Sequence, residues 1–121
     1  MDSKQIDEIA KNGLFDLGIH TVTHPALSFH TKQYQLNEIG ECKSYLENLN
    51  GNFVNAIAYP YGRWNDTTVQ VLKEESIEAG FTTQGYSVNK NSDRYKMGRF
   101  QVNDWDGELF KKHLKLWSSS Y

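Results

Sequence analysis

The sequence predicts a small α/β domain in which helices alternate with short strands that pair in parallel. A length of 121 residues suits one domain and is too short for two ordinary ones. Apolar residues at helical spacing alternate along the chain with short apolar runs, which is typical of parallel strands joined by crossover helices. Glycine and proline residues lie at several boundaries between these segments.

The composition excludes several classes of protein. Hydrophobic residues make up 38% and aromatic residues 13% of the chain, which argues against disorder. A net charge of −2 argues against a nucleic-acid partner. No apolar run could span a membrane and no signal peptide is visible, so the sequence as it stands predicts a cytoplasmic chain while the compartment stays open. Cys42, the single cysteine, can form no internal disulfide.

The first half of the chain is predicted to hold two helices and a strand. Residues 3–12 form a short helix that ends at Gly13. The apolar run at 14–19 suits a buried strand. Residues 32–49 carry apolar side chains at helical spacing and form the longest predicted helix, which stops before Gly51.

The second half continues the alternation. Its predicted strands lie at 53–59, 81–84 and 99–102, and its predicted helices at 65–79 and 107–117. We expect a single domain over residues 1–121, with a frayed tail at 118–121.

Two histidines, His20 and His24, form the first candidate site. On a straight strand they would lie roughly 13 Å apart, too far to share a metal ion. Pro25 disfavours helical backbone at His24 and three β-branched residues precede it, so the segment is also a poor helix. Sharing an ion therefore requires His20 at the end of a strand and a turn that brings His24 back, and we predict that the two histidines approach each other in this way. A pair of structural or exposed histidines is the alternative reading.

Residues 59–66 form the second candidate site, between a predicted strand and a predicted helix. Pro60 lacks an N–H and Gly62 permits unusual dihedral angles, so the segment must turn. Loops at the carboxyl ends of parallel strands build the sites of α/β proteins, where main-chain N–H groups can face a developing negative charge. We expect this loop on the same rim as the histidines, although a tight turn with aromatic packing is the alternative.

Taken together, residues 20–25 and 58–62 resemble the polysaccharide deacetylases of carbohydrate esterase family 4, the NodB-homology domain. The resemblance runs from about Lys4 to Phe110 and includes Glu38-Ile39, Leu46-Glu47, Gly51, residues 79–83, Arg99 and residues 102–106. It implies a partial, distorted (β/α) barrel and a metal-dependent hydrolase that removes N-acetyl, sometimes O-acetyl, groups from an acetylated polysaccharide or oligosaccharide.

The resemblance also implies roles for individual residues. In the family an Asp and two histidines hold zinc or a similar divalent metal, and His20 and His24 match the two histidines. Tyr61 matches the position whose main-chain N–H faces the oxyanion. Arg99 is expected near the catalytic Asp, with a surface arginine as the alternative.

Aromatic side chains line the sugar groove of the family, and core packing is the alternative for each candidate here. The candidates are Tyr59, Trp64 and Trp105. His30 and His113 match no motif and are predicted to face solvent.

The sequence departs from the family in one respect that matters for chemistry. The Thr-Phe-Asp-Asp element, which supplies the catalytic base and the third metal ligand, is not found in it. We therefore expect a barrel without its first strands, an incomplete metal site, and an unpaired edge that favours a homodimer or a partner segment completing the barrel. The alternative function is a catalytically inactive, glycan-binding or structural remnant of the family.

Overall fold

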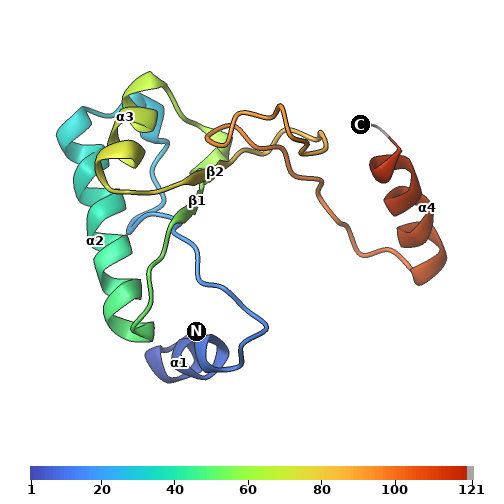
Figure 1. Cartoon of the computed structure of the whole chain (residues 1–121), viewed down its shortest axis with the longest axis horizontal. Helices are drawn as coiled ribbons and strands as arrows, with labels where there is room; N and C mark the ends of the chain where they lie inside the picture. Colours follow the sequence, from blue (N-terminus) through green and yellow to red (C-terminus); the bar gives the residue numbers. More distant parts are fainter. Residues whose placement is uncertain (120–121) are drawn as a thin grey trace.

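The computed structural model describes residues 1–119, which form a small α/β unit and a C-terminal helix that stands apart from it (Figure 1). These residues contain the helices α1 (Ser3–Lys11), α2 (Lys32–Asn50), α3 (Asp66–Glu74) and α4 (Gly107–Ser118), the strands β1 (Ala56–Ala58) and β2 (Ala79–Phe81), and the 3₁₀ turns η1 (Leu27–Phe29) and η2 (Pro60–Gly62). None of the helices in this range has both the length and the hydropathy that crossing a membrane requires.

Parallel pairing organises the sheet. Strands β1 and β2 pair in parallel, with Ile57 opposite Gly80. A single parallel bridge joins Ile19 to Ile57, and another joins Phe81 to Met97, so the pairing continues in chain order on both sides. The predicted α/β class with parallel strands is confirmed. Because all the pairs are parallel, the segments that follow Ile19, β1, β2 and Met97 all start at one edge.

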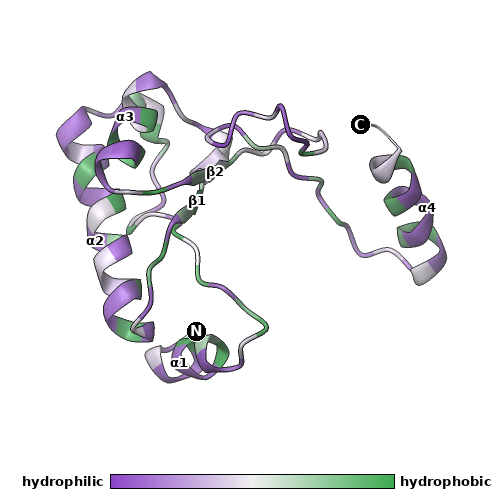
Figure 2. Ribbon diagram, in the orientation of Figure 1, coloured by the Kyte–Doolittle hydropathy of each residue, from purple (hydrophilic) through white to green (hydrophobic). Residues whose placement is uncertain are grey.

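The hydrophobic core lies where α2 and α3 pack beside the sheet (Figure 1). Its fully buried members come from the sheet, both helices and the loops between them: Ile19, Leu27, Ile39, Val54, Ile57, Tyr59, Val71, Leu72 and Ile77. Along α2, hydrophobic and hydrophilic stretches alternate (Figure 2), as expected of a helix with one face on a core.

The helix ends follow local chemistry. The side chains of Thr31, Asn65 and Asp106 accept hydrogen bonds from main-chain N–H groups in the first turns of α2, α3 and α4. Helix α2 ends at Gly51, whose φ of 70° is left-handed. The helices predicted at 3–12, 32–49 and 107–117 are therefore confirmed to within a residue or two.

A buried polar network joins the loop before α2 to the start of α3. The Thr68 hydroxyl donates to Gln35 Oε1 at 2.6 Å, and Gln35 Nε2 donates to the carbonyl of His30 at 3.0 Å. Asn65 Nδ2 donates to the carbonyl of Ser28 at 3.2 Å. A buried polar group without a partner is destabilising. These bonds satisfy the buried groups and hold the segment before α2 and the start of α3 together.

The first two predicted strands are longer than the observed ones. In the run 14–19 only Ile19 pairs, while Leu14 is 84% exposed, and in the run 53–59 only Ala56–Ala58 is a strand, while Phe53 is 90% exposed. A strand exists only where a neighbour completes its hydrogen bonds, and apolar residues outside that pairing stay in the open. Several of them border a hollow of about 610 Å³ at the other end of the sheet.

The later predictions also need correction. The helix predicted at 65–79 ends at Glu74, because the chain turns there to bury Ile77 and then forms β2. The strand predicted at 81–84 consequently begins two residues earlier, and 99–102 is not a strand. Of the tail predicted at 118–121, Ser118 is the last residue of α4, whereas residues 120–121 lie outside the described residues.

The core assignment predicts unequal effects for two large side chains. We expect Ile57→Ala to lower the free energy of unfolding by about 2–5 kcal/mol, because it opens a cavity under fully buried neighbours. Phe53→Ala should change it by less than about 0.5 kcal/mol, since that ring is exposed. Urea denaturation of both variants measures the difference, and equal losses would contradict the core described here.

Candidate active site

Four loops meet at the edge where the parallel segments end. His20 follows the bridge at Ile19, the η2 turn with Tyr61 follows β1, Thr82 follows β2, and Arg99 lies just beyond Met97. This arrangement confirms that the loop at 59–65 shares a rim with the histidines. Such a rim is where α/β proteins build their sites.

His20 is oriented by the sheet. Its Nδ1 lies 2.8 Å from the carbonyl oxygen of Ala58 in β1. A carbonyl oxygen can only accept, so in the neutral ring Nδ1 carries the proton and Nε2 keeps its lone pair. Because the side chain is exposed, Nε2 is open to a ligand. Histidines that bind metal ions are commonly held in this way, through the other ring nitrogen.

His24 returns to the same place. Its ring centroid lies 4.8 Å from that of His20, with the planes at 70°, and 4.6 Å from that of Tyr61, with the planes at 76°. The prediction that the two imidazoles approach each other, with His20 at the end of a paired segment, is confirmed. The return depends on left-handed backbone at Thr21 (φ 66°) and at His24 itself (φ 60°).

Strained backbone is concentrated on the rim. Within residues 1–119 the non-glycine residues with positive φ are Thr21, His24, Tyr61 and Ser76, and the first three lie here. Such residues cost about 1–3 kcal/mol each and often mark functional sites. Beside Tyr61, a Cβ on Gly62 would lie 2.2 Å from Thr83 Oγ1, so the turn packs too closely on the next loop for any other residue.

The histidine pair fits part of a metal site. Two imidazole nitrogens suit zinc and related divalent ions, and a zinc site takes three or four protein ligands. Across residues 1–119, no third His, Cys, Asp or Glu joins them in a group able to hold an ion. Among residues 1–119, His20 and His24 can therefore fill two ligand positions of one metal ion, and the remaining positions need other donors.

Arg99 is fastened to the end of β2. Its Nε donates to the carbonyl of Thr82 at 2.8 Å, and its main-chain N–H donates to the carbonyl of Gln84 at 2.9 Å. A hollow of about 260 Å³ opens beside it, lined by Thr83, Arg99, Phe100 and Gln101. Thr82 and Thr83 were not predicted as functional, because both were expected inside a strand at 81–84, and only the observed end of β2 at Phe81 puts them on the rim.

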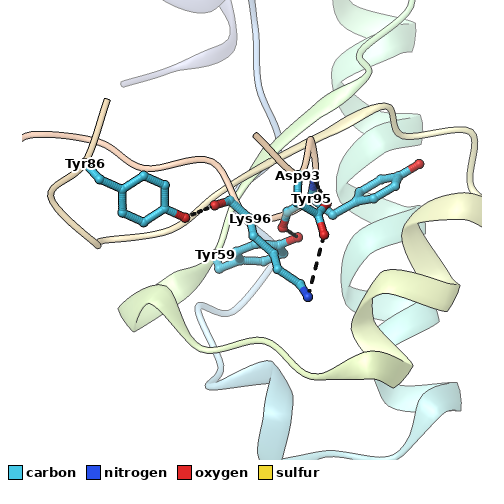
Figure 3. A network of polar contacts seen from close by, with 5 residues as sticks. All are labelled: Tyr59, Tyr86, Asp93, Tyr95 and Lys96. Carbon is cyan, nitrogen blue, oxygen red and sulfur yellow. Dashed lines mark hydrogen bonds and ion pairs between the residues drawn. The ribbon is translucent and has the colours of Figure 1, made fainter. Parts of the chain in front are cut away.

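Tyr59 packs in the core, which was the alternative to a place in the sugar groove. It is 1% exposed, its hydroxyl donates to the carbonyl of Tyr95 at 2.7 Å (Figure 3), and its ring fills the space over Gly80. Burial, with the nearby charge of Asp93 as a smaller cause, raises the pKa of the Tyr59 hydroxyl far above its usual value. A side chain enclosed in this way is part of the core and cannot line a sugar groove.

Trp64 is half-buried and closer to the rim. Lys96 Nζ lies 4.8 Å from the centroid of its ring, and the centroid of the Tyr59 ring lies 6.3 Å away. Lys96 also forms an ion pair with Asp93 at 3.6 Å and accepts a hydrogen bond from Tyr86 through its carbonyl (Figure 3). The network therefore fixes one face of the indole.

Trp105 belongs with α4. Its ring stacks on His113 with centroids 3.9 Å apart and planes at 8°, and it lies 6.0 Å from Trp117. His113 was predicted to face solvent, but it is half-buried because it stacks on Trp105. His30 is exposed as predicted and stacks on Tyr34 at 4.1 Å.

The chain belongs to the polysaccharide deacetylase family: the sequence model of the family described as Polysaccharide deacetylase matches residues 1–83. A poly-β-1,6-N-acetyl-D-glucosamine N-deacetylase from Staphylococcus epidermidis is 30% identical over 97% of this chain and 42% of its own length. The chain thus spans about two fifths of the length of the curated relatives it matches.

Solved structures of deacetylases share the fold. The deacetylase PplD of Streptococcus pyogenes, determined in complex with acetate, is 30% identical with a TM-score of 0.80, over 84% of this chain and 45% of that one. A polysaccharide deacetylase from Bacillus cereus is 28% identical with a TM-score of 0.82, over 93% of this chain and 36% of that one. The α/β unit described above is therefore a part of the deacetylase fold.

The burial of Tyr59 predicts a distinct alkaline titration. The folded pKa lies above the unfolded value of 10.0, so its contribution to stability is complete below that pH and is lost as the pH rises towards the folded pKa. We expect a late tyrosinate step in absorbance at high pH that is missing in Tyr59→Phe. Tyr61→Phe, at an exposed ring of the same turn, is the control, and a late step that survives Tyr59→Phe would contradict the assignment.

Proposed function

We propose that this chain carries part of the active site of a metal-dependent polysaccharide N-deacetylase, with His20 and His24 as two ligands of a divalent ion, zinc in the first instance. The observation that carries the proposal is the histidine pair itself. One ring is held through Nδ1 by the sheet, the other faces it at 4.8 Å, and both are exposed. Two exposed histidines without a ligand would not need strained backbone to bring them together.

The residues of the rim have complementary roles in this proposal. A bound divalent ion would polarise the acetyl carbonyl and lower the pKa of a water molecule. His20, held through Nδ1, presents Nε2, and the left-handed turn at Tyr61 offers its main-chain N–H to the oxyanion of the tetrahedral intermediate. Arg99, fixed by Thr82, places a positive charge on the same rim, where it can pair with the carboxylate that acts as base.

The proposed substrate is an acetylated hexosamine polymer. The Staphylococcus epidermidis relative is named for poly-β-1,6-N-acetyl-D-glucosamine, which makes N-acetyl groups the first target and O-acetyl groups the second. Trp64 on the turn after β1 and Trp105 beside α4 are the proposed sugar-stacking residues. Tyr61 is 65% exposed and its ring contacts that of His24, so it offers a further apolar surface beside the proposed metal ligands.

We also propose that another polypeptide segment, or a second copy of the chain, covers the open edge of the sheet. On the side away from β1, the segment that ends at Ile19 has no strand partner among residues 1–119. Three large apolar residues that precede this segment's bridge or β1 are exposed: Leu14, Phe15 and Phe53. Unpaired strand edges with exposed apolar neighbours tend to pair with another polypeptide segment. Such a segment could supply the missing carboxylates.

Metal titration tests the ligand assignment. We expect His24→Ala to weaken the binding of Co²⁺ or Zn²⁺ by at least about tenfold, because it removes one of two nitrogen donors. His30→Ala is the matched control, since His30 is also exposed and stacks on Tyr34. Isothermal titration calorimetry measures both, and equal affinities would show that the pair holds no ion.

Acetate release tests the activity. With two histidines and no carboxylate in a common group within residues 1–119, we expect the 121-residue chain to turn over acetylated hexosamine oligomers slowly. The loss of a general base alone lowers rates by about 10²–10⁴-fold. Rapid metal-dependent release that His20→Ala abolishes would show that Asp16 or a second subunit completes the site.

A further inference from the structure

The segment between the two histidines has a backbone that needs external support. Thr21 has a φ of 66° and His24 a φ of 60°. Left-handed backbone is uncommon outside glycine and is an outlier for a β-branched residue such as Thr21. Residues of this kind persist where the surrounding structure holds them in place.

Glu38 provides such support from the middle of α2. Its Oε2 accepts hydrogen bonds from the main-chain N–H groups of Val22 at 2.8 Å and Thr23 at 2.9 Å. Its Oε1 accepts one from the Thr23 hydroxyl at 2.6 Å. Both carboxylate oxygens are thus engaged by the two residues that lie between the strained ones.

The carboxylate is buried and charged. Glu38 is 8% exposed, and burial by itself raises the pKa of its carboxyl group. The hydrogen bonds from the Thr23 hydroxyl, from the main chain of Thr23 and Val22, and from Tyr34 together outweigh this and hold the pKa below its ordinary value. Hydrogen bonds to a charged acceptor are stronger than those between neutral groups, so the loop is held firmly.

The helix beneath Glu38 cannot easily shift. Gln35, one turn earlier, and Ile39, the next residue, are both fully buried, the first in the polar network with α3 and the second in the core. The support for the loop therefore comes from a rigid element. Within the loop, Thr21 Oγ1 accepts a hydrogen bond from the main-chain N–H of His24 at 3.1 Å, which closes the turn.

We propose that Glu38 is a positioning residue that sets His24 beside His20 and Tyr61 by holding the main chain of Val22 and Thr23. The inference deepens the proposed function and rests on it as far as metal binding is concerned. Without the carboxylate two main-chain N–H groups lose their acceptor, and the loop is free to relax towards extended backbone. Extended backbone would place the two histidines roughly 13 Å apart.

Three variants of the chain test the proposal by NMR. Glu38→Leu removes both acceptor oxygens, Thr23→Val removes only the hydroxyl bond, and Glu41→Leu is the matched control at an exposed carboxylate on the same helix. We expect amide exchange at Val22 and Thr23 in Glu38→Leu to be at least about tenfold faster, with loss of the ring contact between His24 and Tyr61. Thr23→Val should show a smaller change and Glu41→Leu none.

The amide of Ile57 in β1 reports whether each variant is folded. If Ile57 keeps its protection in Glu38→Leu while Val22, Thr23 and the His24–Tyr61 contact also stay unchanged, the proposal is overturned. If Glu38→Leu does not fold, Thr23→Val decides: faster exchange at Thr23 supports the proposal and unchanged exchange refutes it.

A cobalt titration of the same variants separates this inference from the proposed function. If the histidine pair binds Co²⁺, Glu38→Leu should weaken binding by about tenfold, the effect expected for a group that orients a metal ligand. Unchanged cobalt affinity would count against the role of Glu38. If the unsubstituted chain binds no cobalt, the metal assignment fails, whereas exchange and ring contacts still decide whether Glu38 positions His24.

Discussion

Parallel hydrogen bonds on both sides of β1 determine where the loops that carry the functional side chains begin. The main-chain N–H of Ile19 donates to the carbonyl of Ala56 at 2.8 Å, and that of Ala58 donates back to Ile19 at 3.0 Å. On the opposite side, Tyr59 donates to Phe81 at 3.0 Å. Because these pairs are parallel, the loops that follow them leave from one edge, and residues distant in sequence become neighbours. The carbonyl of Ala58 then accepts a further bond, from the first histidine.

Helix α2 is the second element on which the site depends. Its inner face carries two polar side chains one turn apart, Gln35 and Glu38, among apolar neighbours. Gln35 bonds to Thr68 and to the carbonyl of His30, while Glu38 bonds to the loop at 22–23. Buried polar groups are tolerated when all their hydrogen bonds are made. The partners of Glu38 lie in the loop that carries both histidines, whereas those of Gln35 lie in α3 and just before α2. One helix thus connects the core to the candidate site.

Three of the four predicted helices and the motifs were predictable because both depend on local chemistry. Apolar spacing and capping residues predicted α2, including its end before Gly51, and the histidine spacing with Pro25 predicted a turn. The strands were less predictable. Phe53 belongs to an apolar run, yet it is exposed, because strand length depends on the neighbour available for pairing and not on the run itself.

The sequence by itself determined the class of fold, the positions of the long helices and the residue types of the candidate site. Only the tertiary structure decided which of these residues can act together. It placed Tyr59 in the core and His24 against His20, and it gave Glu38 a loop to hold. The physical reason is that burial, ring contacts and buried hydrogen bonds join segments far apart in the chain. The spacing of residues along the sequence does not reveal these contacts, because they arise only when parallel pairing around β1 brings the segments together.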